Sequence, residues 1–281
     1  MTASGFARSL SPVLAYEGGK VDDPNDPGGR TNQGVIQRVY DGYRVSVGKP
    51  KQDVYQMTDG ERDDIYRKQY WDAVRGDALP AGVDFVVFDG AVNSGPGQSI
   101  KWLQRALGVN ADGVIGMVTM NALASVTNHD ALVDRIIDRR EAFLRALKTF
   151  KIYGKGWLAR TAKVRALGKS WAIDETPTPI SIVAPRAASP KADVADAQTM
   201  PNAAVGDAST SAGVVTAGVG GTLQTLQDQL TPFSTSSAWI GKLVIALVIL
   251  GALLAIGGLA YRWWASRKRA RIADAMNGAH A

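Results

Sequence analysis

The composition of the chain changes near residue 174, and this change limits where a folded core can form. From Asp174 to Ser237 the sequence shifts to Pro, Ala, Ser, Thr and Gly, with few large apolar residues. Such a segment cannot bury enough apolar surface to offset the conformational entropy that folding removes. We therefore predict a disordered linker over 174–237 and a folded domain of moderate size over residues 1–173.

Helical periodicity dominates the folded part, where apolar residues recur at helical spacing between short turns. Thr58 and Glu61 form a capping-box pattern, and Asn128 is placed to cap a long helix. The very apolar run over 83–92 predicts a buried central helix. Residues 20–36 are rich in glycine and turn formers, which predicts a β-hairpin. The expected fold class is mostly α (α+β), with a helical domain and a small β-hairpin.

Candidate catalytic groups follow a predicted helix over residues 4–16, which Gly18 ends. Glu17 stands at the end of this helix, and Asp26 and Thr31 lie in the predicted hairpin, which can fold them back toward Glu17. Hydrolysis of a glycosidic bond needs a proton donor for the leaving oxygen and a second group that orients water or stabilises positive charge. The alternative is that the aspartates near Pro27 only form turns.

This segment resembles the signature of a known family. Residues 17–32 read EGGKVDDPNDPGGRTN, which is similar to the signature of glycoside hydrolase family 108. That family contains lysozyme-like muramidases, including many phage endolysins. Residues 89–97 (DGAVNSGPG), 112–116 (DGVIG) with Thr119, and 156–160 (GWLAR) resemble the predicted peptidoglycan-binding half that usually follows. The resemblance implies a lysozyme-like catalytic part over 1–91 and a peptidoglycan-binding helical part of the same domain over 92–173.

The resemblance also implies roles for individual residues. Glu17 falls on the proposed catalytic glutamate, and Asp26 and Thr31 fall on positions that resemble the Asp and Thr of phage lysozymes. The family motif has an aromatic residue where this chain has Lys20, so sugar stacking is not expected there. The candidate substrate-binding residues are Asn32, Asn93 and Ser94. The 93–96 junction has two open interpretations: it binds an N-acetyl sugar or peptide stem, or it is only a helix end followed by a cap.

Composition excludes several other site types. The chain has no cysteine and only two histidines, which excludes thiol nucleophiles and cysteine zinc sites. Proline and glycine occupy ligand positions of any calcium loop over 22–34, so no metal or other cofactor is predicted. The net charge of +6 is compatible with nucleic-acid binding. However, the sequence contains no zinc finger and no phosphate-binding glycine motif, so we expect no nucleic-acid partner.

A long apolar run near the C-terminus predicts membrane attachment. Eighteen consecutive uncharged residues, 243–260, are flanked by tryptophans and followed by a basic cluster. We predict a single transmembrane helix over 238–264 and a basic cytoplasmic tail over 265–281. The lipid bilayer is then a partner, and Gly251 and Ala255 allow homo-association of the helix. The expected location is the bacterial host inner membrane, with the catalytic domain on the periplasmic or wall side.

Together with the resemblance, these features predict a membrane-anchored muramidase. Such a phage or prophage endolysin cleaves the β-1,4 bond between N-acetylmuramic acid and N-acetylglucosamine in the glycan strands of peptidoglycan. Two alternatives stay open. The chain is a noncatalytic murein-binding or membrane-lesion protein, or it is a lytic transglycosylase that uses the same glutamate.

Overall fold

The computed structural model describes residues 5–22, 29–172, 191–201 and 238–276. The chain divides into two compact units, the first formed by residues 1–198 and 275–281 and the second by residues 199–274.

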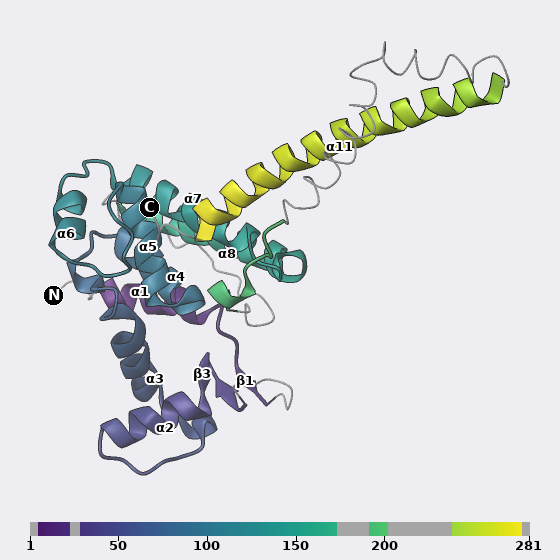
Figure 1. Ribbon diagram of the computed structural model, residues 1–281. Coiled ribbons are helices and arrows are strands. Elements are labelled where there is room, and N and C mark those ends of the chain that lie inside the picture. Colours follow the sequence, from purple (N-terminus) through teal and green to yellow (C-terminus); the bar gives the residue numbers. More distant parts are fainter. Residues whose placement is uncertain (1–4, 23–28, 173–190, 202–237, 277–281) are drawn as a thin grey trace. The chain divides into compact units, whose positions relative to one another are not determined.

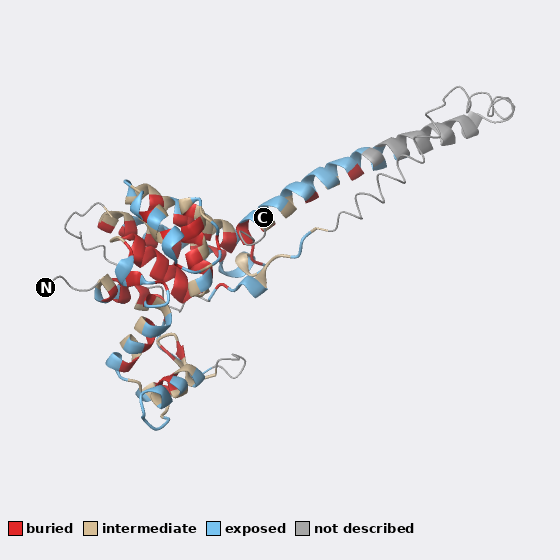
Figure 2. Cartoon of the chain, turned by 60° about the vertical axis from the view of Figure 1, so that its left-hand side comes forward, coloured by how far each residue is buried: buried red, intermediate tan, exposed pale blue. Residues whose placement is uncertain are grey.

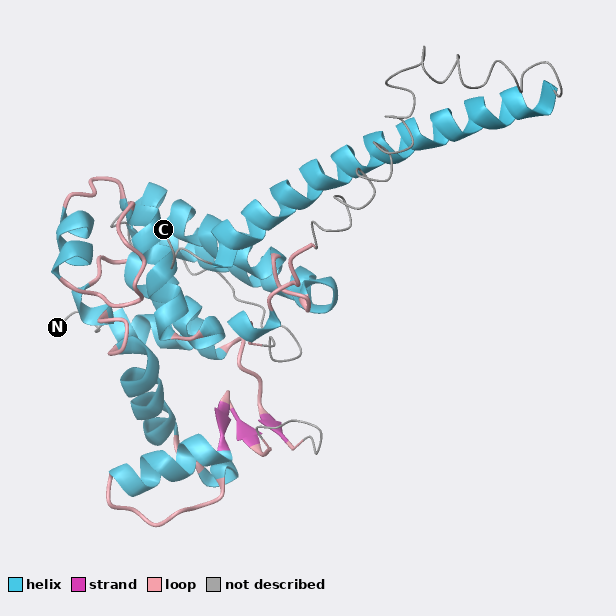
Figure 3. Cartoon of the chain, viewed as in Figure 1, coloured by secondary structure: helices cyan, strands magenta, loops and turns pink. Residues whose placement is uncertain are grey.

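Helices make up most of the first unit, with one small sheet formed by residues 20–36 (Figures 1 and 3). This confirms the mostly helical fold class. The helices are α1 (Gly5–Leu14), α2 (Gln37–Ser46), α3 (Asp59–Tyr66), α4 (Val83–Ser94), α5 (Pro96–Leu107), α6 (Met117–Ala124), α7 (His129–Arg145) and α8 (Phe150–Ala172). Short 3₁₀ turns are η1 (Val54–Gln56), η3 (Gly76–Ala78) and η4 (Val194–Asp196), and η2 (Arg67–Trp71) is a π-helical segment that continues α3.

Helix α4 is the central helix of the core, as the apolar run over 83–92 predicts. Every residue of α4 except Ser94 is buried, and the helix packs against α1, α5, α7 and α8. Figure 2 shows this buried layer in red. Phe88 of α4 meets Phe6 and Trp71 edge to face, with ring centroids 5.9 Å and 5.4 Å away. Such pairs stabilise a core beyond the burial of their area.

Local sequence signals set several helix boundaries. Thr58 and Glu61 form the complete capping box of α3, and the Asn128 side chain accepts a hydrogen bond from the Ala131 amide at 2.8 Å to cap α7. Pro96 occupies the first turn of α5, where a missing N–H costs no helical hydrogen bond. These signals act within one helical turn, so the sequence reveals them directly.

Asp84 in the first turn of α4 is a buried carboxyl. Burial raises its pKa to about 6, although the Phe85 amide, which donates to it at 2.7 Å, and Arg8 at 3.6 Å both act to lower that pKa. A carboxyl with a raised folded-state pKa binds its proton more tightly in the folded chain than in the unfolded chain. The stability contributed by Asp84 is therefore present below about pH 4 and lost as the pH rises through about 6.

We expect Asp84→Asn to stabilise the fold at pH 7, because asparagine keeps an acceptor for the Phe85 amide and carries no charge to bury. The gain should reach at most about 3 kcal/mol and vanish near pH 4. Thermal unfolding of both proteins at pH 4, 5.5 and 7 measures this difference. A difference between variant and parent that stays constant over this range contradicts the prediction.

The predicted hairpin is a three-stranded antiparallel sheet in the order β1 (Lys20–Val21), β2 (Thr31–Asn32) and β3 (Val35–Ile36). Gln33 and Gly34 join β2 to β3, and both have positive φ values, 48° and 79°. This is the backbone of a tight hairpin turn whose twist matches the strands. The Tyr66 hydroxyl donates to the Gln33 carbonyl at 2.9 Å, and Arg62 donates to its side-chain oxygen at 2.8 Å, so α3 fixes the turn.

The structure describes residues 191–201 of the predicted linker, and residues 191–198 contact the helical domain. The Ala192 amide donates to the Asn93 carbonyl at 3.0 Å, and the Gln198 amide donates to the Ala146 carbonyl at 2.8 Å. Carbonyl groups at the C-terminal ends of α4 and α7 thus accept hydrogen bonds from amides of this segment. Composition does not encode such contacts. The rest of the predicted linker, over 174–190 and 202–237, lies outside the described residues.

The DGVIG motif over 112–116 is a packed turn. The Gln104 side chain of α5 donates to Asp112 at 2.7 Å and to the Val114 carbonyl at 3.0 Å, and it accepts from the Gly113 amide at 2.9 Å. Gln104 is buried, and these bonds satisfy its amide. The motif therefore anchors the loop between α5 and α6.

The second unit contains α11 (Ala238–Met276) except for its last two residues. Within the described ranges, no helix is both long and apolar enough to cross a bilayer, so the structure does not support the predicted transmembrane anchor over 238–264. Helix α11 continues past residue 264 through the basic residues Arg267, Lys268 and Arg271. Gly251 and Ala255, on which the predicted homo-association rests, lie among residues whose side chains are not described.

Candidate active site

Glu17 lies just after α1, where the helix tightens and stops. The amides of Tyr16 and Glu17 donate to the carbonyls of Val13 and Leu14 at 3.0 Å and 3.1 Å. Gly18 then adopts a φ of 69°, which glycine reaches without steric cost and which ends the helix as predicted. This geometry turns the Glu17 side chain into the protein, where only 4% of it is exposed.

The carboxyl group of Glu17 is held by an arginine from the other end of the domain. Nη1 of Arg160, on α8, donates to Oε1 of Glu17 at 3.2 Å. The Arg160 guanidinium also lies over the ring of Tyr16, 4.7 Å from its centroid. Arg160 is 1% exposed, so both members of the pair are shielded from water.

Arg160 belongs to a buried network of alternating charges. Its Nη2 and Nε donate to Oδ2 of Asp89, on α4, at 2.8 Å and 3.0 Å. Arg140, on α7, donates to Oδ1 of Asp89 at 2.6 Å. Two acids and two bases therefore alternate inside the core, and both buried arginines have Asp89 as an opposite charge nearby.

The pKa shifts in this network follow the balance between burial and pairing. Burial lowers the pKa of Arg160, but Asp89 and then Glu17 outweigh it and hold that pKa above its ordinary value. Burial raises the pKa of Asp89, but Arg160 and Arg140 outweigh it and hold that pKa below its ordinary value. Asp89 and Arg160 thus stay charged at neutral pH.

The turn between β2 and β3 closes over Glu17. A Cβ atom added to Gly34 would lie 2.5 Å from the Tyr66 hydroxyl oxygen and 2.8 Å from Oε2 of Glu17. Only glycine fits this close approach. Burial, followed by the charge of Glu17, raises the pKa of the Tyr66 hydroxyl well above its ordinary value, so Tyr66 remains a hydrogen-bond donor.

The other predicted catalytic residues are placed as follows. Thr31 lies in β2, and its hydroxyl donates to the Gly29 carbonyl at 3.1 Å. Asp26 lies outside the described residues. The structure therefore brings Glu17 together with the predicted hairpin through Gly34, and the joint placement of Glu17, Asp26 and Thr31 stays a prediction.

The predicted substrate-binding residues make contacts within the protein. Asn32 is buried, and its side-chain amide donates to the Val54 carbonyl at 3.1 Å, which ties the sheet to η1. Asn93 and Ser94 end α4, and the Ser94 hydroxyl donates to Oδ1 of Asn93 at 3.3 Å. These contacts fit the helix-end interpretation of the 93–96 junction. Binding of substrate by these residues stays a prediction.

Comparison with known proteins places this chain in a family. The family model described as Glycosyl hydrolase 108 matches residues 10–95, and the model described as Predicted Peptidoglycan domain matches residues 98–162. The solved structure of Brucella abortus SagA is 39% identical, covers 60% of this chain and 97% of its own, and superposes with a TM-score of 0.53. The chain belongs to glycosyl hydrolase family 108. No curated protein matches the chain.

Membership in family 108 confirms the predicted enzyme class. This chain is a lysozyme-like glycoside hydrolase, and peptidoglycan is its partner. In the described part of this family 108 hydrolase, no group of three or more His, Cys, Asp or Glu side chains is arranged to hold a metal ion.

Sequence reasoning missed three residues of the site in this family 108 hydrolase: Asp89, Arg140 and Arg160. One signal was available, because Asp89 interrupts the apolar run over 83–92. A charge on a fully buried helix requires an opposite charge nearby. The sequence does not reveal which of its many arginines supplies that charge, since Arg140 and Arg160 lie 51 and 71 residues away.

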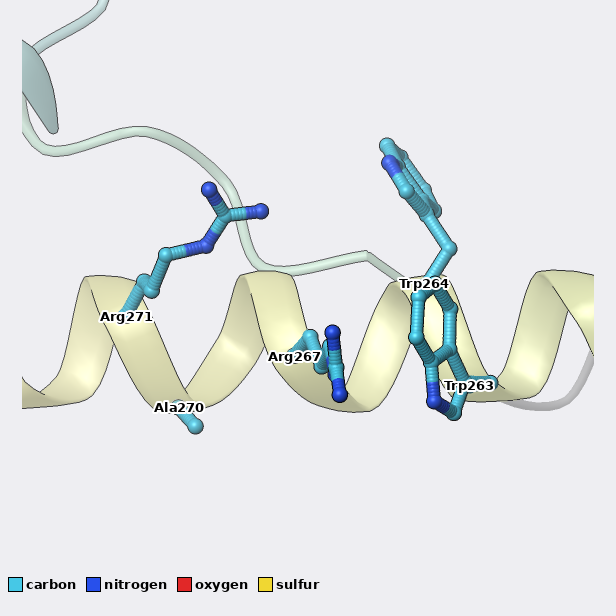
Figure 4. A pocket seen from close by; sticks show the side chains of 5 residues that line it. All are labelled: Trp263, Trp264, Arg267, Ala270 and Arg271. Atoms are coloured by element: carbon cyan, nitrogen blue, oxygen red, sulfur yellow. The ribbon is translucent and has the colours of Figure 1, made fainter.

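Helix α11 of the hydrolase presents an aromatic and basic face at the predicted basic cluster. Trp263, Trp264, Arg267, Ala270 and Arg271 line a hollow on this helix (Figure 4). The Arg267 guanidinium lies 4.0 Å from the centroid of the Trp263 ring, a cation–π contact. All the residues that line the hollow come from a single helix, so the hollow does not resemble an enclosed ligand site.

Proposed function

We propose that this hydrolase cleaves the β-1,4 bond between N-acetylmuramic acid and N-acetylglucosamine, with Glu17 as the general acid. The observation that carries the proposal is the position of the Glu17 carboxyl between the helical body and the sheet, held by Arg160. A guanidinium only donates, so Oε1 accepts from Arg160. The catalytic proton is then on Oε2, the oxygen that faces the turn between β2 and β3.

The sheet residues complete the proposed mechanism. Asp26 orients the attacking water or stabilises positive charge on the sugar, and Thr31 assists it. The close approach of Gly34 to Glu17 supports this assignment, because it brings the sheet that contains Thr31 beside the acid. Asn32, Asn93 and Ser94 are the proposed substrate contacts. Ser94 is the most accessible of the three, since Asn32 and Asn93 are buried.

A lytic transglycosylase, which needs only one catalytic carboxyl group, is the second candidate. Asp89, the carboxylate joined to Glu17 through Arg160, is fully buried and bonded to two arginines. It is therefore unable to activate a water molecule on a sugar. Either Asp26 supplies the second carboxylate, or Glu17 acts alone as acid and then base, in which case the muramic acid hydroxyl attacks and an anhydro sugar forms.

Product analysis distinguishes these reactions. Purified peptidoglycan is digested with the full chain, and the released muropeptides are identified by mass spectrometry with and without borohydride reduction. The proposal predicts reducible N-acetylmuramic acid ends. Anhydro ends, which resist reduction and are lighter by one water molecule, indicate the transglycosylase. Reducible N-acetylglucosamine ends show that the enzyme cleaves the other glycosidic bond and contradict the proposal.

We also propose that the hydrolase acts on the periplasmic or wall side of the bacterial inner membrane, in the manner of an endolysin. Peptidoglycan lies on that side, so the first unit must reach it. Protease treatment of intact spheroplasts that express the full chain tests this location. Cleavage of the chain from outside is the expected result, and full protection contradicts it.

A further inference from the structure

We infer that Arg160 is a positioning residue for Glu17, and that the region matched by the Predicted Peptidoglycan domain model therefore forms part of the catalytic site. The inference rests on the proposed role of Glu17. Glu17 and Asp89 lie in the region matched by the Glycosyl hydrolase 108 model, whereas Arg140 and Arg160 lie in the second region. The charged network therefore joins the two matched regions at the catalytic acid.

The geometry of Arg160 allows one side chain to serve two carboxylates. The edge formed by Nε and Nη2 binds Asp89 at 3.0 Å and 2.8 Å, which leaves Nη1 to reach Glu17 at 3.2 Å. A planar guanidinium presents its donors in a rigid fork, so fixing one edge also fixes the direction of the remaining donor. Asp89 thus orients Arg160, and Arg160 orients Glu17.

Burial makes this arrangement rigid. The side chains of Asp89, Arg140 and Arg160 are at most 1% exposed, so none of them can exchange its partner for water. A buried charge that leaves its partner has a high energetic cost, which holds Arg160 in a single position. The catalytic carboxyl therefore takes its orientation from α8, a helix 143 residues away in sequence.

The charged groups nearest Glu17 come from separate helices. Arg160 on α8 donates to Glu17, Asp89 on α4 binds the other edge of the same guanidinium, and Arg140 on α7 balances Asp89. The Tyr66 hydroxyl on α3 meets the Glu17 carboxyl beside Gly34. The position of Glu17 therefore depends on α3, α4 and α8 together.

The same helix contains a control for Arg160. Arg165 on α8 also bridges two carboxylates, those of Asp134 at 3.0 Å and Asp138 at 2.7 Å, and neither belongs to the charged network. Arg160→Lys and Arg165→Lys thus make the same chemical change in an arginine that bridges two carboxylates. A role of Arg160 limited to the stability of the fold predicts similar activity per folded molecule for the two variants.

The test compares kcat, KM and the pH–rate profile of Arg160→Lys, Arg165→Lys and the parent as full chains, per folded molecule by circular dichroism. A lysine ammonium does not span both carboxylates as the fork does. We expect Arg160→Lys to lower kcat by on the order of 10²-fold with little change in KM, because the acid loses its alignment. Arg165→Lys should keep kcat within about threefold of the parent. Equal kcat and superimposable profiles for the two variants overturn the inference.

Asp89→Asn provides the second test and applies even if Arg160→Lys does not fold. Asparagine preserves the shape of Asp89 but removes its charge, so it holds the edge of Arg160 formed by Nε and Nη2 less firmly. Glu17 then loses its fixed orientation, and kcat should fall by on the order of tenfold with little change in KM. Loss of folded protein alone does not lower kcat per folded molecule. An unchanged kcat in Asp89→Asn contradicts the inference.

The outcome for Glu17 separates this inference from the proposed function. If Glu17→Gln keeps its activity, the proposed function fails and the Arg160 variants have no acid to position. If Glu17→Gln is inactive while Arg160→Lys matches the parent in kcat and pH profile, the proposed function stands and the positioning role of Arg160 is wrong.

Discussion

Glu17→Gln is expected to lose peptidoglycan cleavage by on the order of 10²- to 10⁴-fold in kcat, because an amide has no proton to give to the leaving oxygen. This loss corresponds to roughly 3–5 kcal/mol of transition-state stabilisation. The glutamine oxygen can still accept from Nη1 of Arg160 at the position of Oε1, so the side chain keeps its orientation. The release of reducing ends from purified peptidoglycan measures the effect.

A matched carboxyl elsewhere in the domain controls for loss of charge. Glu141 on α7 accepts a hydrogen bond from the Thr161 hydroxyl at 3.0 Å, and its side chain is 24% exposed. Glu141→Gln should leave activity within about twofold of the parent. Glu17→Gln should also keep its binding to insoluble peptidoglycan, which separates the chemical step from substrate binding. Undiminished cleavage by Glu17→Gln refutes the assignment of the general acid.

Gly34→Ala is expected to lower activity on the order of 10²-fold, because the added methyl group collides with both Tyr66 and Glu17. Its Cβ would lie 2.8 Å from Oε2, the oxygen that carries the proton in the proposed mechanism. The φ of 79° adds backbone strain of about 1–2 kcal/mol for any residue with a Cβ. The prediction is checked by kcat together with the melting temperature.

Gly29→Ala separates strain from collision. Gly29 also has a positive φ, 62°, but an added Cβ there meets nothing within 4 Å. Both variants should lose similar stability from the backbone, whereas only Gly34→Ala should lose activity per folded molecule. Equal activity losses in the two variants would show that the close approach of the turn to Glu17 has no catalytic importance.

The local features of this fold could be predicted from the sequence. The Thr58 capping box, the Asn128 cap and the stop at Gly18 are all confirmed, because each depends on residues within a few positions of one another. The buried helix over 83–92 was also predictable, since burial in the core removes a long run of apolar side chains from water. These signals are enough to place Glu17 at a helix end beside a hairpin.

Predictions that depended on composition over long segments are not confirmed by the structure. The Pro-, Ala- and Ser-rich segment after residue 173 predicted disorder, yet residues 191–198 bind the ends of α4 and α7 through backbone hydrogen bonds. Every residue type except proline offers the same backbone donor and acceptor, so composition does not distinguish a docked segment from a free one. Likewise, the apolar run over 243–260 predicted a membrane span that the described helices do not support.

The sequence by itself determined the helical character of the domain, the helix end at Gly18 and the choice of Glu17 as the candidate acid, since these follow from short-range sterics and from the chemistry of single residues. Only the tertiary structure decided that Arg160 holds Glu17, that Asp89 and Arg140 complete the network, and that Gly34 closes over the acid. Contacts between residues 17 and 160 depend on the packing of α1, α4 and α8 around one core. No local pattern specifies which buried arginine will meet which buried carboxylate.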